Sequence, residues 1–486
     1  MVRLGMITNK IDYKVYSNKP FAIWANSRII NERLSANSYN RDYLDFAKAK
    51  NTFNFKKVSD IAKVTAMIGW KGLTTDDYVD EDGVYLLRTV DIKDNYIDLE
   101  NAVMAKREKV YEQPQIILKQ GDIIFSKDGT LGITAIVPRH QNKEMCVGST
   151  LARIRLNSNL DNYYVCAAFM SKIVQAQIGY FTSGIAQPHI TQEYINKLEI
   201  PIPSPEIQKY IGDKVRKAEE LREEAKRLKK EAEEIFFNEI NIVSIDNAFK
   251  KEQHIKFNWI NIDELDVNRI DAEYNRRKYT ILVKLLIDNN ITLIPISNLL
   301  EEPIVSGSTP KGGNYIENGI PFVRATNLCE YSIDDNLVYI SKEESDKLKN
   351  SEIRSGDVVF SIAGSIGVAS IIPSYIEKAN INQALVRLRL NNINKYYFVF
   401  VVNSSIGRLL SLRLANGAVQ LNLNREEVGN IMVPRINDNK EEIIANKIKL
   451  YIELLYQSKQ LIQEAKQDVE DLIEGNFDMS KVKANS

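Results

Sequence analysis

Two long stretches of this chain place apolar or small residues at steps of three and four, with charged residues between them. In the first stretch these positions are Ile207, Ile211, Val215, Ala218, Leu221, Ala225, Leu228, Ala232 and Ile235. The second stretch repeats the same spacing 237 residues later (444 − 207), at Ile444, Ile448, Ile452, Leu455, Ser458, Ile462, Ala465, Val469 and Leu472. So narrow a seam is typical of coiled-coil helices. Because pairing within one chain avoids the entropy of association, we expect the two helices to pack antiparallel against each other.

The repetition continues upstream of both seams. "GDIIFSKDGTLGITAIVP" from Gly121 matches "GDVVFSIAGSIGVASIIP" from Gly356, an offset of 235 (356 − 121). "GIAQPHITQEYINKLEIP" from Gly184 matches "GAVQLNLNREEVGNIMVP" from Gly417, an offset of 233 (417 − 184). The matches keep their order, and the period is far longer than that of a solenoid repeat. The pattern therefore indicates two duplicated domains.

Before the first long helix, over 51–204, the pattern is one of short β-branched and apolar runs bounded by Gly, Pro, Asp or Asn, which predict strands. We predict an α+β multidomain fold with two similar α/β domains separated by two long helices that form an antiparallel coiled coil. The predicted segments are a lead-in over 1–50, a first globular domain over 51–204, a long helix over 205–240, a connector and second lead-in over 241–289, a second globular domain over 290–437, a second long helix over 438–475 and a tail over 476–486.

Composition narrows the functional classes. The 64 basic and 64 acidic residues cancel, so any nucleic-acid surface must be a local patch rather than a general positive charge. The three cysteines, Cys146, Cys166 and Cys329, have no metal-ligand spacing and are typical of a reduced, cytoplasmic protein. No apolar run reaches the roughly 18 residues of a membrane span, so no membrane association is expected.

The motifs of the common catalytic sites are absent from the sequence. It contains no Gly-x-Gly-x-x-Gly, no Walker phosphate loop and no Asn/Asp-Pro-Pro-Tyr/Phe motif of amino-methyltransferases. The three histidines, His140, His189 and His254, lack metal-ligand spacing. We therefore expect a chain that is not an enzyme and holds no cofactor or metal, with a role in recognition or as a scaffold.

The order of these segments and four local motifs resemble the specificity (S) subunit of type I restriction-modification systems. The motifs are "RIDAEYNRR" from Arg269, "SGSTPKGGNYIENGIPFVRATNL" from Ser306, "GDVVFSIAGSIG" from Gly356 and "GAVQLNLN" from Gly417. The resemblance covers nearly the whole chain. The first copy departs from the pattern, with "MIGWKGLTT", "SKDGTLG" and "AQPHI" at the matching places. Two readers of different half-sites would need such differences.

The resemblance implies a function. Each globular domain would be a target-recognition domain that reads one half of a bipartite, asymmetric sequence in double-stranded DNA. The chain would bind two methyltransferase (M) subunits and, through them, motor-nuclease (R) subunits. S-adenosylmethionine, ATP and Mg would be bound by those partners, and the methyltransferase would flip an adenine out of the stack before methylating it. The alternative is a structural adaptor or an anti-restriction decoy with the same fold but no DNA reading.

Polar loop residues are the candidate DNA contacts, because their donors suit phosphates and base edges. In the first domain they are Trp70, Lys71, Thr74, Arg88, Lys127, Ser149, Gln187 and His189. In the second they are Ser308, Thr309, Lys311, Arg324, Asn327, Ser365, Gln383, Gln420 and Asn422. Two alternatives stay open: Thr309 and Lys311 could belong to a simple turn, and the matched Arg88 and Arg324 could form buried ion pairs.

Overall fold

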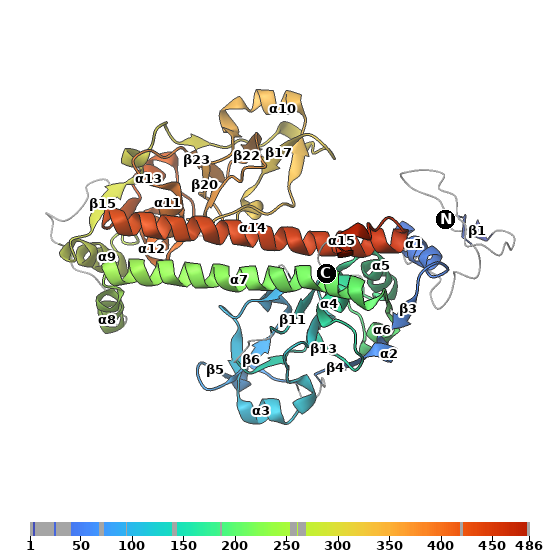
Figure 1. The fold of residues 1–486 in the computed structure, drawn as a ribbon. Coiled ribbons are helices and arrows are strands. Elements are labelled where there is room, and N and C mark those ends of the chain that lie inside the picture. Colours follow the sequence, from blue (N-terminus) through green and yellow to red (C-terminus); the bar gives the residue numbers. More distant parts are fainter. Residues whose placement is uncertain are drawn as a thin grey trace. The chain divides into compact units, whose positions relative to one another are not determined.

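The computed structural model describes residues 3–4, 24–25, 40–67, 72–93, 95–138, 143–184, 187–252, 260, 269–417 and 421–483. The chain divides into two compact units (Figure 1). Unit 1 consists of Met1–Arg222 and Tyr456–Ser486, and unit 2 of Glu223–Leu455. Each unit therefore contains one sheet-rich domain, the first half of one long helix and the second half of the other.

The helices of unit 1 are α1 (Arg41–Ala49), α2 (Val58–Ile61), α3 (Arg107–Tyr111), α4 (Asn162–Met170), α5 (Lys172–Phe181), α6 (Gln192–Lys197) and α15 (Ser480–Lys483). Its strands are β1 (Arg3–Leu4), β2 (Trp24–Ala25), β3 (Phe55–Lys57), β4 (Ala62–Ala66), β5 (Tyr78–Val79), β6 (Val84–Leu87), β7 (Ile92–Lys93), β8 (Tyr96–Ile97), β9 (Val103–Ala105), β10 (Ile123–Ser126), β11 (Thr134–Ile136), β12 (Met145–Val147), β13 (Leu151–Leu156) and β14 (Glu199–Pro201). Helix α7 (Pro205–Glu239) begins in this unit.

The helices of unit 2 are α8 (Ile242–Glu252), α9 (Arg277–Asp288), α10 (Lys342–Lys347), α11 (Lys395–Asn403), α12 (Ser405–Leu414), α13 (Arg425–Gly429) and the first part of α14 (Asp438–Glu474). Its strands are β15 (Thr292–Pro295), β16 (Val305–Ser306), β17 (Ile320–Val323), β18 (Val338–Ile340), β19 (Glu352–Ile353), β20 (Val358–Ser361), β21 (Ala369–Ile371), β22 (Ala379–Ile381), β23 (Leu385–Leu388) and β24 (Met432–Arg435).

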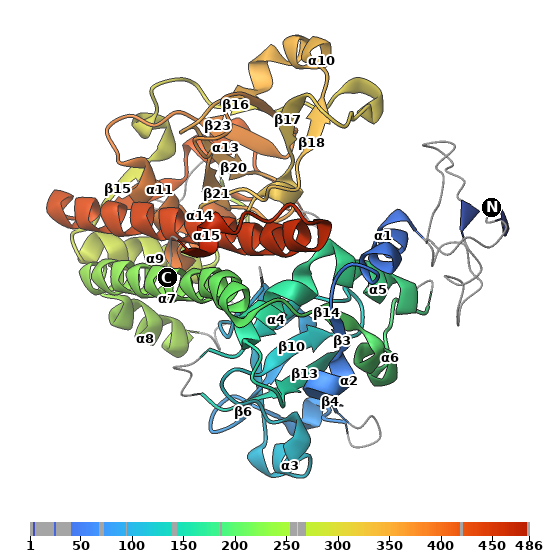
Figure 2. The same cartoon turned by 45° about the vertical axis from the view of Figure 1, so that its right-hand side comes forward.

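Each unit contains two four-stranded sheets. In unit 1 the strand orders are β11-β10-β13-β4 and β12-β6-β9-β5, and Figure 2 shows β10, β13 and β4 side by side. In unit 2 the orders are β16-β23-β20-β21 and β18-β17-β22-β19. The first sheet of each unit is antiparallel and has the same order in reverse listing, with β10 and β20 in equivalent places. The second sheet of each contains one parallel pair, β12–β6 or β17–β22. The predicted fold class, with two similar domains, is confirmed.

A largely apolar helix forms the centre of each domain. In α4 every residue from Tyr163 to Met170 is buried, and in α11 every residue from Tyr397 to Asn403. A helix that is apolar on all sides must be covered on all sides. Helix α4 packs on β11, β14 and α5, and the Phe169 ring meets Phe125 of β10 at 5.7 Å between centroids. These helices carry the sheets and, with them, the loops at the strand ends.

The two long helices run antiparallel within each unit. In unit 1, Lys214 of α7 bonds Asp468 of α14 at 2.7 Å, and Tyr210 meets Phe477 at 6.0 Å between ring centroids. In unit 2, Glu231 pairs with Lys447 and Glu239 with Lys440. As residue numbers rise along one helix, the partners' numbers fall along the other. The antiparallel pairing predicted from the seams is thus present in both units.

The helix register differs from the one inferred from the seams. The Tyr164 hydroxyl donates to the Pro201 carbonyl, and the equivalent Tyr397 hydroxyl donates to the Pro434 carbonyl, which gives an offset of 233 (397 − 164). The ion pairs Lys214–Glu464 and Lys447–Glu231 give the same offset (447 − 214). The offset of 237 is therefore wrong by about one turn. A repeat of threes and fours looks the same after such a shift, so the apolar pattern alone could not fix the register.

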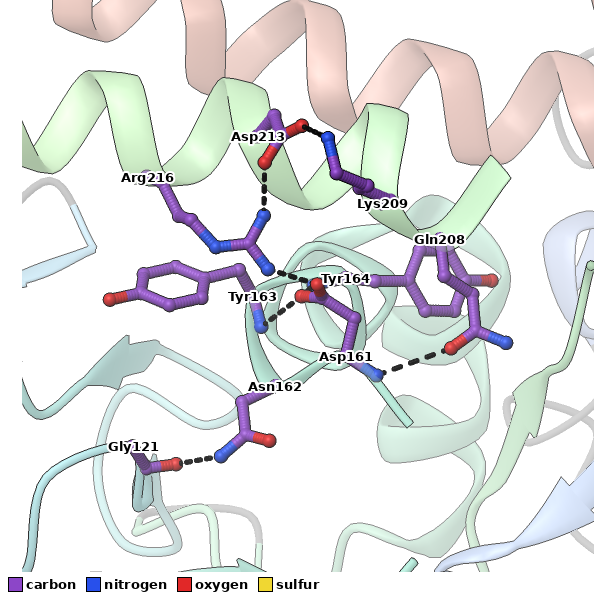
Figure 3. A network of polar contacts seen from close by, with 9 residues as sticks. All are labelled: Gly121, Asp161, Asn162, Tyr163, Tyr164, Gln208, Lys209, Asp213 and Arg216. Carbon is purple, nitrogen blue, oxygen red and sulfur yellow. Dashed lines mark hydrogen bonds and ion pairs between the residues drawn. The ribbon is translucent and has the colours of Figure 1, made fainter. Parts of the chain in front are cut away.

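The end of α4 ties the first domain to α7 (Figure 3). Asp161 caps α4 by accepting from the backbone N–H groups of Tyr163 at 2.9 Å and Tyr164 at 3.0 Å. The same carboxylate accepts from Arg216 of α7, and the Asp161 N–H donates to Gln208 at 3.2 Å. A cavity of about 640 Å³ lies beside these residues. Because one carboxylate serves both as cap and as ion-pair partner, the sheet domain is held at a defined place on the helix.

Candidate nucleic-acid interface

Four loops of unit 1 come together at the ends of the strands of both sheets. The Gly148 N–H donates to the Leu87 carbonyl at 2.8 Å, and the Lys127 N–H to the Thr150 carbonyl at 2.9 Å. The Ile190 N–H donates to the Lys127 carbonyl at 3.0 Å. With the bond from the Thr89 N–H to the Thr150 hydroxyl at 3.3 Å, they join residues 88–91, 127–132, 148–150 and 187–190, which we call the first loop cluster. Strand ends from both sheets thus present their polar loops together.

Unit 2 builds the same arrangement from equivalent bonds. The Asn382 N–H donates to the Val323 carbonyl at 3.0 Å, and the Ile362 N–H to the Ala384 carbonyl at 2.9 Å. The backbone bridge between Asp128 and His189 in unit 1 has its counterpart between Ala363 and Asn422. Residues 308–309, 324–327, 362–367, 382–384 and 421–423 form the second loop cluster. The two clusters share one backbone frame.

Most of the predicted contact residues lie in these clusters. The first loop cluster contains Arg88, Lys127, Ser149, Gln187 and His189. The second contains Ser308, Thr309, Arg324, Asn327, Ser365, Gln383 and Asn422. Ser149, Gln187, Ser308, Thr309, Ser365, Gln383 and Asn422 are exposed. The Thr309 hydroxyl donates to the Gln383 amide oxygen, which brings two distant predicted residues into contact.

Some predicted residues are not placed in a cluster. Trp70, Lys71 and Gln420 lie outside the described residues, and so does the side chain of Lys311. Thr74 is exposed but belongs to a short turn, where its N–H donates to Asp77 at 2.9 Å.

The matched arginines have different partners. Arg88 forms a two-pronged ion pair with Asp91, at 3.0 and 3.1 Å, and Asp91 is only 4% exposed. Arg324 contacts the Asn327 amide oxygen at 3.4 Å and lies over the Tyr315 ring, 6.0 Å from its centroid. Arg88 therefore forms the ion pair that was the alternative to a DNA contact, and its guanidinium stabilises the turn between Arg88 and Asp91.

Asn327 was predicted to contact DNA, but the structure places its side chain inside the loop. Its side chain is 3% exposed, its amide oxygen accepts from the Arg324 N–H at 3.0 Å, and its amide nitrogen donates to the Asn336 carbonyl at 3.0 Å. With both ends bonded inside the turn, Asn327 shapes the loop and does not face outward. This role is not visible in the sequence, because an exposed Asn and a turn-capping Asn cannot be told apart by residue type.

Asp128 is a residue of the first loop cluster that the sequence analysis missed. Its carboxylate accepts from Lys127 at 2.7 Å and contacts His189. Burial acts to raise the pKa of Asp128, but the hydrogen bonds from Lys127 and His189 outweigh it and hold the pKa below its usual range. An acidic residue is not expected on a DNA-binding loop. The sequence signal that could have identified Asp128 is a difference between the copies: Asp128 follows the candidate Lys127, and the second copy has Ala363 at this position.

Two further features bear on the chemistry of the described part of the chain. Within it, no group of three or more His, Cys, Asp or Glu side chains could hold a metal ion. None of the helices described has an apolar stretch long enough to cross a membrane.

Comparison with known proteins places this geometry. Residues 50–234 match the model of a family described as the type I restriction modification DNA specificity domain. No curated protein matches the chain. A type I S subunit from M. genitalium is similar, with 15% identity, coverage of 88% of this chain and 97% of that one, and a TM-score of 0.42. The HsdS subunit from Thermoanaerobacter tengcongensis has 12% identity, coverage of 87% and 97%, and a TM-score of 0.29. The matched family is the one that the sequence motifs resemble, and the match extends over residues 50–234 of this chain.

Proposed function

We propose that this chain reads a bipartite, asymmetric DNA sequence, each loop cluster contacting one half. The observation that carries the proposal is a pair of loop clusters with one backbone frame and different side chains. Ser149 is replaced by Gln383, and His189 by Asn422. Gln and Asn side chains can bond an adenine edge with two hydrogen bonds. His189 uses Nδ1 on Asp128, which leaves Nε2 for such a contact. Two loop clusters with the same backbone arrangement but different side chains are what recognition of two different DNA half-sites requires.

The chain itself is a non-catalytic specificity subunit. In this proposal it docks two methyltransferase subunits and, through them, motor-nuclease subunits. The methyltransferase brings S-adenosylmethionine, and the motor-nuclease brings ATP and Mg. Because the substrate is the DNA of the cell, the complex works in the cytoplasm.

A selection experiment tests the proposal. The full chain is purified with its methyltransferase subunit and mixed with a random library of DNA duplexes, and bound duplexes are sequenced. We expect enrichment of two short defined segments separated by an unspecified spacer of fixed length. If the complex forms but enriches no sequence, the chain is an adaptor or decoy, and the proposal is overturned.

A further inference from the structure

Three side chains of the first loop cluster form a connected polar group. The Lys127 ammonium lies 2.7 Å from one oxygen of Asp128, and Nδ1 of His189 bonds the other oxygen. The backbones of Asp128 and His189 also form a β-bridge. Both side chain and backbone therefore hold the imidazole in place. At the equivalent positions unit 2 has Ile362, Ala363 and Asn422, so this group belongs to the first reader alone.

The imidazole presents its second nitrogen outward. The side chain of His189 is 39% exposed, against 15% for Lys127 and 21% for Asp128. Its Nδ1 faces a carboxylate, which requires a proton on that nitrogen and so fixes the ring orientation. Among the residues that the structure describes, none bonds Nε2. The unused nitrogen of a held ring is thus available at the candidate interface.

The Asp128 carboxylate next to His189 favours a protonated imidazole, which can donate a hydrogen bond from Nε2. The charged side chains recorded at this place are Asp128, in contact with His189, and Lys127, on the far oxygen of Asp128. Among the described residues of the bridged segments, Ser183 and Pro188 contribute backbone groups and Ser183 its hydroxyl. Next to the phosphates of DNA, a protonated imidazole is further stabilised. It can then donate to an acceptor, either a base atom such as guanine N7 or a phosphate oxygen.

We infer that His189 contacts DNA in the first half-site as a hydrogen-bond donor, and that Asp128 is its positioning residue. The inference rests on the proposed function and adds a specific residue pair and a dependence on protonation to one of the two readers. Because only the protonated ring can donate from its second nitrogen while the first faces Asp128, affinity is expected to be greater at low pH than at high pH.

The test uses the full chain with its methyltransferase subunit and the duplex that the wild-type complex enriches from a random library. We expect His189→Ala to weaken binding about tenfold, the scale of one good polar contact, and to abolish the dependence of affinity on pH that a donor imidazole gives. Asp128→Asn should weaken binding and reduce this pH dependence, and Asp128→Glu should restore part of both. Asn422→Ala is the matched control from the same bridge of unit 2, and its pH profile should stay that of the wild type.

Repeating the selection with His189→Ala separates the possible acceptors. A changed first half-site identifies a base contact, and an unchanged sequence with evenly weaker binding identifies a phosphate contact; both support the inference. Equal affinity, sequence and pH profile in the wild type and His189→Ala would overturn the inference alone. A wild-type complex that enriches no sequence would overturn the proposed function and this inference together.

Discussion

At the residue scale, Asn422 and His189 hold the same place in a shared backbone frame. Each is paired across a β-bridge with the turn that follows a buried strand, Ala363 with Asn422 and Asp128 with His189. The glycines after those partners, Gly129 and Gly364, both have φ of 76°, a left-handed conformation that a side chain would strain. The turn is therefore preserved by its glycine, and its neighbours are free to differ between the copies.

We predict that a combined Lys311→Ala, Gln420→Ala, Asn422→Ala variant weakens DNA binding far more than it weakens folding. A good two-bond contact to a base contributes about 1–3 kcal/mol, and surface substitutions usually change stability by less than about 0.5 kcal/mol. Binding of the methyltransferase complex to its selected duplex and thermal unfolding of the same sample measure the two effects. Unchanged DNA affinity would remove these loops from the binding surface.

Asp161 supports a second prediction at this scale. Asp161→Ala removes the cap of α4 and leaves Arg216 without this carboxylate, so we expect a loss of about 1–3 kcal/mol in unfolding free energy. Asp161→Asn keeps a capping oxygen and should lose less. Chemical denaturation of both variants measures the difference, and equal stability of Asp161→Ala and the wild type would contradict the assigned role.

At the element scale, the sequence predicted the helices and the duplicated sheets but not the helix register or the inner polar partners. Apolar periodicity marks which face of a helix is buried, and most seam positions are buried. Leu221 and Ile235 of the first seam, and Ile452, Leu455 and Leu472 of the second, are only half-buried. Arg222 and Phe236, the neighbours of the two first-seam residues, are buried instead. Loop residues such as Asn327 were harder, because their roles depend on backbone bonds between segments far apart in sequence. The polar residue types of the two loop clusters could be predicted from the sequence. Which of these side chains face outward and which bond within the loops could not.

The equivalent ion pairs of the two long helices give a matched test. Burial alone would lower the pKa of Lys214, but hydrogen bonds to Asp468 and Glu464 raise it above its ordinary 10.5, so this stabilisation is complete below that value and is lost as the pH rises through the folded-state pKa. At neutral pH, Lys214→Met removes the cation 2.7 Å from the Asp468 carboxylate, which is 4% exposed, and leaves it with Lys481 at 3.6 Å. This change should cost about 1–3 kcal/mol.

Lys447→Met is the control for that change. Its partner Glu231 is 32% exposed and keeps Arg227 at 2.7 Å, so the expected loss is below about 1 kcal/mol. Urea denaturation of both variants at neutral pH decides the matter. A larger loss for Lys447→Met than for Lys214→Met would show that burial does not govern these pairs.

At the scale of the whole molecule, we predict that helix length sets the spacer between the half-sites. Helices α7 and α14 have 35 and 37 residues, and each residue adds about 1.5 Å. Deleting one heptad from each, 219–225 and 456–462, removes about 10 Å of helix, or about three base pairs of duplex. We expect a shorter spacer or loss of activity, with the half-sites unchanged. Selection from a random duplex library with the complex of the shortened chain measures both the spacer and the half-sites. An active complex with the original spacer would contradict the prediction.

Exchange of one globular domain tests most directly whether each loop cluster reads its own half of the target. Residues 51–204 are replaced by the corresponding domain of another type I S subunit, and DNA methylated in cells by the hybrid complex is mapped by long-read sequencing. If each loop cluster reads its own half of the target, one half of the methylated sequence changes to that of the donor and the other half stays as in the wild type. Methylation in which both halves change, or neither does, would contradict the account.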